Sequence, residues 1–430
     1  MRRIFVAVLT TCACAAFARG GFWKAVNAIQ TTVDVANAVS GVANGNSSKA
    51  ATNPTAEKTN TTTSPTTEAT DATAASASAV AAAAPAAPAV PPADVSAFAG
   101  ARTAATDTAV PGVSYGQIVF KKPATPEQIA EAKKAYLSDN RDLEDARLRM
   151  EKVDDATVSA ALAAFNMANY VEIKESPLST LAPFALLGNV TKVSLNKIPC
   201  ADMKPFAACA KLMALELRYC DISDMSGLSA LQALETVDLY GAKVSCSFAP
   251  LAACPNLRKI DFYAVKGPQE VYDSLGTLKQ VKDFLGGLTK MTSIKWLRNV
   301  PQAEAVQIFA EKIDDLSPIS TLANLTYFRG WNMDGGRMAT ALGDLSFLSN
   351  CRKLKKLELP GSAYSNVALI GSFTELEELD LSNAKQPVDV SFVKSLPKLT
   401  RITLRGTEVV NGGAIPANVK IYKDKKTKGL

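Results

Sequence analysis

The apolar residues between Leu212 and Leu239 follow a pattern that begins again after 22 residues. The first eleven positions read L-x-x-L-x-L-x-x-C-x-I, and the same spacing restarts at Leu234. A self-similar unit of this length forms one coil of a solenoid, which cannot bury its apolar edge without neighbouring coils. The pattern therefore predicts a stack of coils, each of which contributes one short strand.

Apolar pairs of the L-x-L type mark the expected strands. Most successive pairs lie 22 or 23 residues apart, which indicates about ten parallel strands. The intervals around Leu297 are the longest, with 37 residues from Ile260 to Leu297 and 31 residues from there to Phe328. Their extra residues, 268–285 and 301–312, are expected to be helical and to form one rim of a binding site. The pairs are Val171/Ile173, Val193/Leu195, Leu215/Leu217, Val237/Leu239, Ile260/Phe262, Leu297/Asn299, Phe328/Gly330, Leu357/Leu359, Leu379/Leu381 and Ile402/Leu404.

The segments between the expected strands carry an apolar residue at every third position, as in the run from Ile222 to Leu234. This step favours 3₁₀ or short helical turns on the convex side of the stack. An aspartate precedes the second apolar position of several segments, where its side chain is expected to cap the free amides of the turn. These aspartates are Asp202, Asp224, Asp315, Asp344 and Asp389.

The repeats resemble those of the bacterial internalin-type leucine-rich-repeat (LRR) family. The resemblance is carried by residues 212–239, by 313–325, which is close to the family's I-x-D-I-S-P-L-x-x-L-x-x-L, and by 344–359. It implies an α/β solenoid, a horseshoe with parallel strands on its concave face, and a protein-binding or adhesive function without a named ligand. One position departs from the family, because the usual asparagine after each strand is replaced. The replacing residues are Ile198, Cys220, Ala242, Val265, Ser362, Ala384 and Thr407.

The N-terminal part of the chain changes character several times. Residues 1–18 combine two arginines, an apolar run and an A-x-A site, which predicts a cleaved signal peptide and a secreted, cell-surface or periplasmic protein. A lipoprotein anchored through Cys12 is the alternative. Residues 19–45 carry a helical apolar stripe, and residues 46–112 form an Ala/Thr/Ser/Pro-rich linker that is expected to be disordered. No apolar run in the sequence is long enough to predict a transmembrane helix.

Helical signals return after the linker. Residues 125–137 begin with an N-cap threonine, a proline and a capping-box glutamine, and a second helix is expected at 155–167. We expect residues 113–168 to form an α-helical N-terminal cap on the LRR domain of residues 169–412, because the first coil would otherwise expose its apolar edge. An independent helical domain is the alternative. Residues 413–430 are expected to form a C-terminal cap and a basic tail.

Composition excludes several functions. The chain has no histidine, so a Ser-His-Asp triad, a Cys-His pair and imidazole metal ligands are excluded. We expect neither an enzyme, nor a metal site, nor a cofactor. The net charge is +6 and the basic residues are not clustered before the tail, so nucleic acid is not an expected partner.

Six cysteines follow the predicted signal peptide. Cys209, Cys254 and Cys351 occupy positions at which other repeats have leucine, so they are expected to be thiols in the core. Cys200 and Cys220 fall in adjacent coils. A disulfide between them is the alternative to free thiols.

Alternation along each strand places one set of side chains on the concave face. Acidic residues, arginines and large aromatic rings collect there, which is the composition of protein-interface hot spots. We therefore predict that this face binds a protein or peptide, and the alternative is a carbohydrate-binding or cell-envelope-associated module in which the rings stack on sugars. The predicted ligand-binding residues are Glu216, Arg218, Tyr219, Asp238, Tyr240, Asp261, Tyr263, Trp296, Arg298, Tyr327, Arg329 and Trp331.

Overall fold

The computed structural model describes residues 113–114, 117–199, 201–310, 312–331 and 341–430. All of them belong to one compact unit, residues 101–430. The predicted signal peptide, helical segment and linker, together with Cys12 and Cys200, lie outside the described residues and stay predictions.

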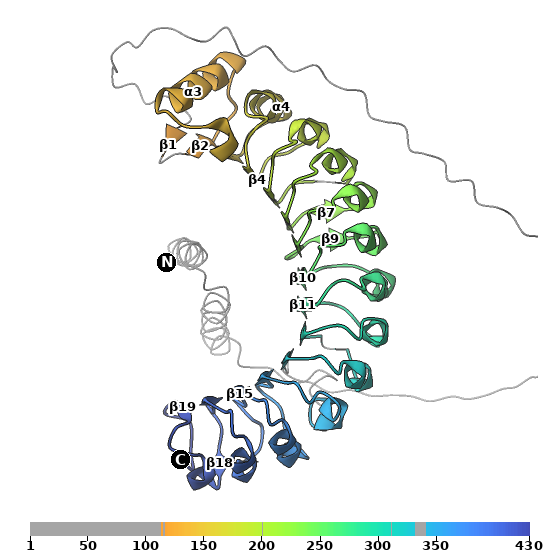
Figure 1. Ribbon diagram of the computed structural model, residues 1–430, viewed down its shortest axis with the longest axis vertical. Helices are drawn as coiled ribbons and strands as arrows, with labels where there is room; N and C mark the ends of the chain where they lie inside the picture. Colours follow the sequence, from red (N-terminus) through yellow and green to blue (C-terminus); the bar gives the residue numbers. More distant parts are fainter. Residues whose placement is uncertain (1–112, 115–116, 200, 311, 332–340) are drawn as a thin grey trace, which may run out of the picture. The chain divides into compact units, whose positions relative to one another are not determined.

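The described residues form a 15-stranded sheet to which successive coils contribute one strand each. Strands β1 (Val113–Ser114) and β2 (Gln117–Phe120) are antiparallel, and the later neighbours pair in parallel. Figure 1 shows the strands of this unit along the inner side of a curved stack and the helical segments along its outer side. The predicted LRR solenoid is therefore confirmed. The later strands of the sheet are β3 (Arg147–Glu151), β4 (Tyr170–Lys174), β5 (Lys192–Asn196), β6 (Ala214–Arg218), β8 (Thr236–Asp238), β10 (Lys259–Tyr263), β11 (Asp283–Gly287), β12 (Ala305–Ile308), β13 (Tyr327–Gly330), β14 (Lys356–Glu358), β15 (Glu378–Asp380), β17 (Arg401–Thr403) and β19 (Lys420–Tyr422).

Short 3₁₀ turns build most of the convex side, as the three-residue apolar step predicts. The backbone amide two residues after each of the five named aspartates donates to that aspartate's side chain at 2.7 to 2.9 Å. The predicted caps are therefore present. The turns are η1 (Leu143–Asp145), η2 (Ala182–Leu186), η3 (Lys204–Ala208), η4 (Ser226–Ala230), η5 (Ala249–Ala253), η6 (Ser274–Thr277), η7 (Lys295–Asn299), η8 (Ser317–Thr321), η9 (Leu345–Leu348), η10 (Val367–Ser372), η11 (Ser391–Ser395) and η12 (Gly412–Ala414). The short helix α5 (Gln269–Asp273) precedes η6, and two small parallel pairs, β7 (Asp221–Ile222) with β9 (Lys243–Val244) and β16 (Val388–Asp389) with β18 (Val409–Val410), complete the coils.

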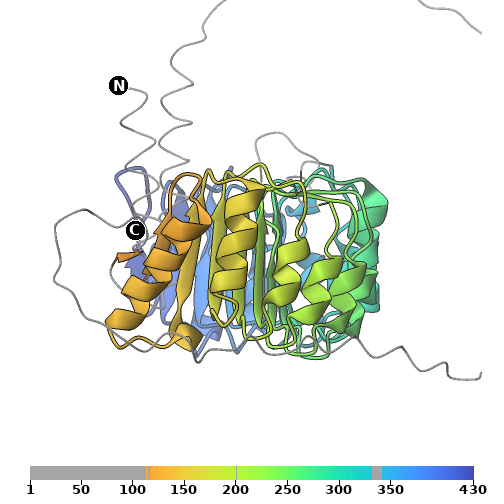
Figure 2. The same cartoon turned by 90° about the horizontal axis from the view of Figure 1, so that it is seen from above.

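The N-terminal segment continues the solenoid. Helix α3 (Pro126–Ser138) has the predicted capping box, and α4 (Asp155–Ala164) is the second predicted helix. Figure 2 shows these helices, in orange and yellow, next to each other on the outer face of the first strands. Strands β2 and β3 pair in parallel with the strands that follow, so the sheet runs through the boundary predicted at residue 168. The first two coils are thus repeats that carry α-helices in place of 3₁₀ turns.

The two long intervals in the sequence contain two strands that the sequence analysis missed, β11 and β12. Residues 269–277 are helical as predicted, in α5 and η6, but residues 283–285 and 305–308 belong to strands, so the predicted helical rim of a binding site is wrong. The strand predicted at Leu297/Asn299 is also wrong, since these residues lie in the convex turn η7. β11 escaped detection because its second inward position is Gly286. A Cβ atom there would lie 2.1 Å from Phe262 Cε2, so the ring of Phe262 fills the space that a leucine usually takes.

The C-terminal residues add the last strand. β19 pairs in parallel with β17, and the backbones of Glu408 and Lys428 form an isolated parallel β-bridge. Part of the segment predicted as a C-terminal cap and basic tail is thus a strand of the sheet. In the described ranges, no helix combines the length and apolar character that a membrane span requires.

The core fills the space between the sheet and the convex turns, and small side chains occupy the position of the family's asparagine. Cys220 is buried with its Sγ 3.7 Å from Leu195 O. Thr407 Oγ1 donates to Leu381 O at 2.8 Å. The buried Ser362 Oγ finds no hydrogen-bond partner among the described residues. The interactions at this position therefore differ from coil to coil, as its mixed composition indicates.

Candidate functional site

The parallel register aligns the outward side chains of neighbouring strands in columns across the concave face. The central column is acidic in the early coils, passes through an uncharged pair, and reaches an arginine before it becomes acidic again. It reads Glu172, Ser194, Glu216, Asp238, Asp261, Leu285, Gln307, Arg329, Glu358, Asp380 and Thr403.

Five aromatic rings form a continuous row at the carboxyl ends of these strands, and we call this row the aromatic ladder. Its members are Tyr219, Tyr240, Tyr263, Phe309 and Trp331. Successive ring centroids lie 5.4, 5.4, 6.0 and 5.6 Å apart. These separations fall in the range of favourable aromatic pairs, so each ring supports the next.

β11 contributes no ring to the aromatic ladder, and Gly287 at its end leaves room for the rings of Tyr263 and Phe309 to meet. A Cβ atom at this position would lie 2.2 Å from Phe309 Cδ2 and 2.6 Å from Tyr263 Cε2. The two rings therefore meet over the glycine, and any larger residue would push them apart. Phe309 itself is only 1% exposed and acts as a support for its neighbours.

Residues that lie one or three positions after the strands have left-handed backbone. Most are small or polar: Lys152, Glu175, Lys197, Gly241, Ala264, Gly361, Asn383 and Gly406. Tyr219 and Leu288 are exceptions, with φ of 55° and 51° and with 49% and 44% of the residue exposed. A bulky side chain on left-handed backbone lowers the stability of the fold. Burial of the side chain does not offset this cost when about half of the residue is exposed. Tyr219, a member of the aromatic ladder, and Leu288, next to Gly287, are therefore candidates for a role in binding.

Two carboxylates, Asp238 and Asp261, lie opposite each other on the adjacent strands β8 and β10. Arg218 donates to Asp238 Oδ2 from Nε at 2.9 Å and from Nη2 at 2.6 Å. Asp261 Oδ1 accepts a hydrogen bond from the Tyr263 amide at 3.0 Å. Burial raises the pKa of Asp261 to about 7, and the Asp238 carboxylate acts in the same direction. This end of the site is therefore acidic.

Arg329 lies at the other end of the ladder and is 6% exposed. Its guanidinium carbon lies 5.4 Å from the Phe309 ring centroid, and its Nε lies 3.1 Å from Glu358 Oε2, an ion-pair distance without hydrogen-bond geometry. The Tyr327 hydroxyl donates to the same oxygen at 3.1 Å, and burial raises the pKa of Tyr327. Lys356 Nζ lies 2.8 Å from Glu358 Oε1. Arg329 is thus part of a buried charge network.

The structure brings most of the predicted site residues together. Glu216, Arg218, Asp238 and Asp261 lie in consecutive strands, and four of the predicted aromatic residues belong to the ladder. Tyr327 and Arg329 lie on the concave side but are nearly buried, with 6% exposed in each case.

Two predicted site residues are misplaced, because the strand expected around Leu297 does not exist. Trp296 is 2% exposed in the convex turn η7, where it packs against Phe284 with ring centroids 5.1 Å apart. Arg298 Nη2 donates to Ser317 Oγ at 3.1 Å on the same side. The site residues that sequence reasoning missed, Leu288 and Phe309, follow β11 and β12. Gly287 was a signal for them, because a glycine between two aromatic positions marks a close approach of rings.

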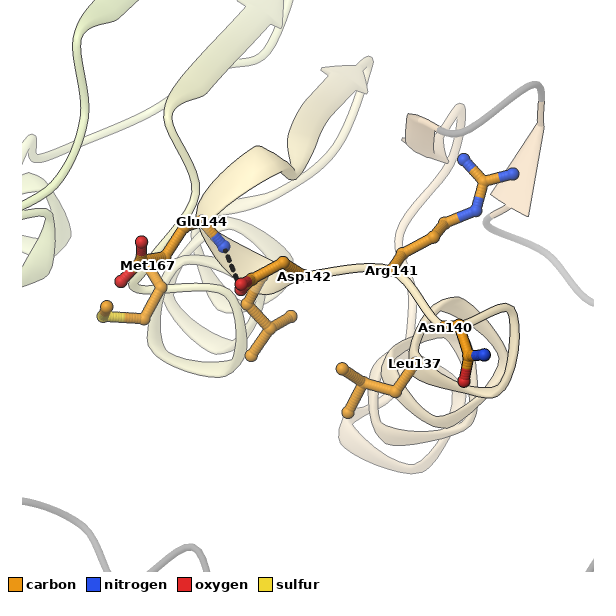
Figure 3. Close-up of a pocket in the computed structure, with 7 residues that line it drawn as sticks. Leu137, Asn140, Arg141, Asp142, Glu144 and Met167 are labelled. Carbon is orange, nitrogen blue, oxygen red and sulfur yellow. Dashed lines mark hydrogen bonds between the residues drawn. The ribbon is translucent and has the colours of Figure 1, made fainter.

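Two hollows lie among the described residues of the first coils. One hollow, of about 450 Å³, is lined by residues that include Leu137, Arg141 and Met167. Figure 3 shows its lining side chains, among which the Glu144 amide donates to Asp142 Oδ1 at 3.0 Å. A second hollow of about 430 Å³ includes Arg149 and Glu172, which pair with each other. Nowhere in the described part of the chain do three cysteine or acidic side chains come together as metal ligands.

Neither a protein-family model nor a curated protein matches the chain in sequence. Solved structures are similar in fold. An internalin (inlF) from Listeria monocytogenes matches with a TM-score of 0.50 and 19% identity over 70% of this chain and 97% of its own. Internalin C2 from the same species matches with a TM-score of 0.35 and 21% identity, over 41% of this chain and 75% of its own. An LRR protein from Leptospira interrogans matches with a TM-score of 0.38 and 11% identity, over 69% of this chain and 92% of its own. At such identities the similarity to the first internalin shows the LRR fold, and the fold resemblance predicted from the repeats is confirmed.

Proposed function

We propose that this chain is an exported LRR protein that binds a protein or peptide on its concave face, at the aromatic ladder. The unbroken row of rings from Tyr219 to Trp331 carries the proposal. Large rings bury much area at a small cost in conformational entropy, so they dominate the energetics of protein interfaces. The exposed Tyr219 and Leu288, held in left-handed backbone, support the same location because they contribute little to the core.

Export is supported by residues 1–18, whose composition is that of a signal peptide. We propose binding rather than catalysis because the carboxylates on this face project from an open sheet. The acidic pair Asp238 and Asp261 also disfavours a polyanionic ligand such as nucleic acid.

Partner capture with matched variants tests the proposal. The full chain carrying Tyr219→Ala and Trp331→Ala should lose its partner, whereas Leu186→Ala, at an exposed position on the convex turn η2, should retain it. Far-UV circular dichroism of the three proteins should be the same, because none of the changes removes a fully buried side chain. Equal capture by all three proteins would contradict a concave binding face.

A further inference from the structure

The ring geometry of the aromatic ladder limits what it can bind. Tyr240 and Tyr263 are stacked on each other with an interplanar angle of 7°. Each of these rings therefore has one face covered by the other, and the neighbouring rings approach them at 73° and 77°. A sugar ring that stacks on an aromatic side chain needs an open ring face. Tyr240 and Tyr263 instead present their ring edges to a ligand. Ring edges favour contact with apolar side chains.

Asp261 is a carboxylate without a matching cation. Arg218 donates both of its hydrogen bonds in this cluster to Asp238, and no described residue forms an ion pair with Asp261 within 4.0 Å. The Tyr263 amide occupies Oδ1 of Asp261, and none of the described residues donates a hydrogen bond to its Oδ2. Asp261 is partly exposed on the concave side. A desolvated charge of this kind is costly until a partner supplies the opposite charge.

The titratable groups near Asp261 come from its own strand and from the strands before it. Asp238 lies opposite it on β8 and Tyr240 follows β8, while Lys259 and Tyr263 belong to its own strand; Asp283 of β11 pairs in register with Lys259. Lys259 and Arg218 of β6 lower its pKa by longer-range attraction, but burial and Asp238 outweigh them. Burial also raises the pKa of Asp283, whose nearest cation is Arg258 at 3.9 Å. The cluster therefore remains short of positive charge at its centre.

The unmatched charge and the rings lie close together. Asp261 and Tyr263 are two residues apart on one strand, which corresponds to roughly 7 Å. The rings of Tyr219, Tyr240 and Tyr263 follow one another at 5.4 Å, a stretch that about three residues of extended peptide would span. A short segment can thus reach the carboxylate and the ring edges at once.

We propose that the ligand of the aromatic ladder is an extended peptide segment whose lysine or arginine side chain pairs with Asp261, while adjacent apolar side chains pack against the edges of Tyr219, Tyr240 and Tyr263. This inference rests on the proposed concave-face function and adds the chemistry of the partner to it. Charge complementarity selects the cation, and the stacked rings select a peptide over a glycan.

A peptide selection with the full chain tests the inference. The probe is a phage library of random peptides, and the best binder is then synthesised with and without its basic residue replaced by glutamine. Affinities are measured for the wild type, for Asp261→Asn, for Tyr219→Ala, and for Glu131→Gln as an exposed carboxylate control on α3. Selected peptides should be enriched in lysine or arginine next to apolar residues. Replacing the basic residue should weaken binding about tenfold or more to the wild type and to Glu131→Gln, but less than about twofold to Asp261→Asn.

The outcomes separate the two proposals. Peptides that depend on Tyr219 but lack a basic residue, or that lose equal affinity on wild type and Asp261→Asn, would overturn the inference and leave the binding face intact. Saturable binding on a glycan array that competes with the peptide would overturn the choice of a peptide ligand. A wild-type chain that selects no peptide at all would contradict both proposals.

Discussion

The rings of Tyr263 and Phe309 meet across Gly287, with centroids 6.0 Å apart and planes at 77°. These residues come from β10 and from the end of β12, and the strand between them contributes no side chain at this level. The glycine therefore joins two halves of the aromatic ladder that would otherwise be separate. A single methyl group at this position tests that relationship.

Gly287→Ala should destabilise the protein by about 1 to 3 kcal/mol, because the added Cβ overlaps both rings and the neighbouring side chains must move. Urea unfolding followed by circular dichroism measures the effect. Gly188→Ala is the control, since a Cβ there meets no atom within 4 Å and stability should be unchanged or slightly higher. Equal stability of the two variants would show that the rings do not close over Gly287.

Asp261→Asn should stabilise the protein at alkaline pH. The pKa of Asp261 is about 7 in the fold and near the ordinary aspartate value of 3.8 when unfolded, so the folded state holds the proton more tightly. Stability therefore falls as the pH rises from about 4 to 7, and the penalty is complete above pH 7. The variant lacks this penalty and should gain up to about 4 kcal/mol at pH 8, with no gain at pH 4. A variant less stable than wild type at pH 8 in thermal unfolding would contradict the uncompensated charge.

The two tryptophans Trp296 and Trp331 should respond in opposite ways. Trp296→Ala should cost about 3 to 5 kcal/mol, because this side chain is 2% exposed and packs against Phe262 and Phe284. Trp331→Ala should cost about 1 kcal/mol, since it loses one ring contact with Phe309. Chemical unfolding measures the stabilities. Trp331→Ala should lose ligand capture, whereas Trp296→Ala should retain it if this variant folds. Capture lost by a folded Trp296→Ala and retained by Trp331→Ala would place the site on the convex side.

The thiols should differ in reactivity. Burial raises the pKa of Cys209 and Cys351 to about 12 and that of Cys254 to about 11, so these groups remain protonated and inaccessible at neutral pH. Cys246 is partly exposed and should react first with iodoacetamide in the native protein, as peptide mass spectrometry would show. Early labelling of Cys209 would contradict the packing. The same measurement without reductant tests the predicted alternative of a Cys200–Cys220 disulfide.

The fold was readable from the sequence because burial of the repeats imposes a fixed spacing. Leucines at 22-residue intervals place Leu215, Val237 and their equivalents correctly, and the capping aspartates follow from turn chemistry. The spacing rule failed where side chains from neighbouring coils share one space. At Gly286 the ring of Phe262 replaces the expected leucine, and this hid β11.

That failure also limited the prediction of the site. Once a strand was placed at Leu297, Trp296 and Arg298 were assigned to the concave face, and Phe309 was not considered. Asp238 and Asp261 were both predicted on the concave face, but the stacking of Tyr240 on Tyr263 and the lack of a cation at Asp261 depend on side-chain orientation. Such orientations follow from packing across coils, which spacing in a single sequence does not determine.

Site-specific photocrosslinking locates the ligand most directly. Tyr240→benzoylphenylalanine places a photoreactive group within the aromatic ladder, and Leu186→benzoylphenylalanine places it on the convex surface. After irradiation with the selected peptide, mass spectrometry should find the covalent adduct at position 240 and none at position 186. An adduct at position 186 without one at position 240 would contradict binding on the concave face.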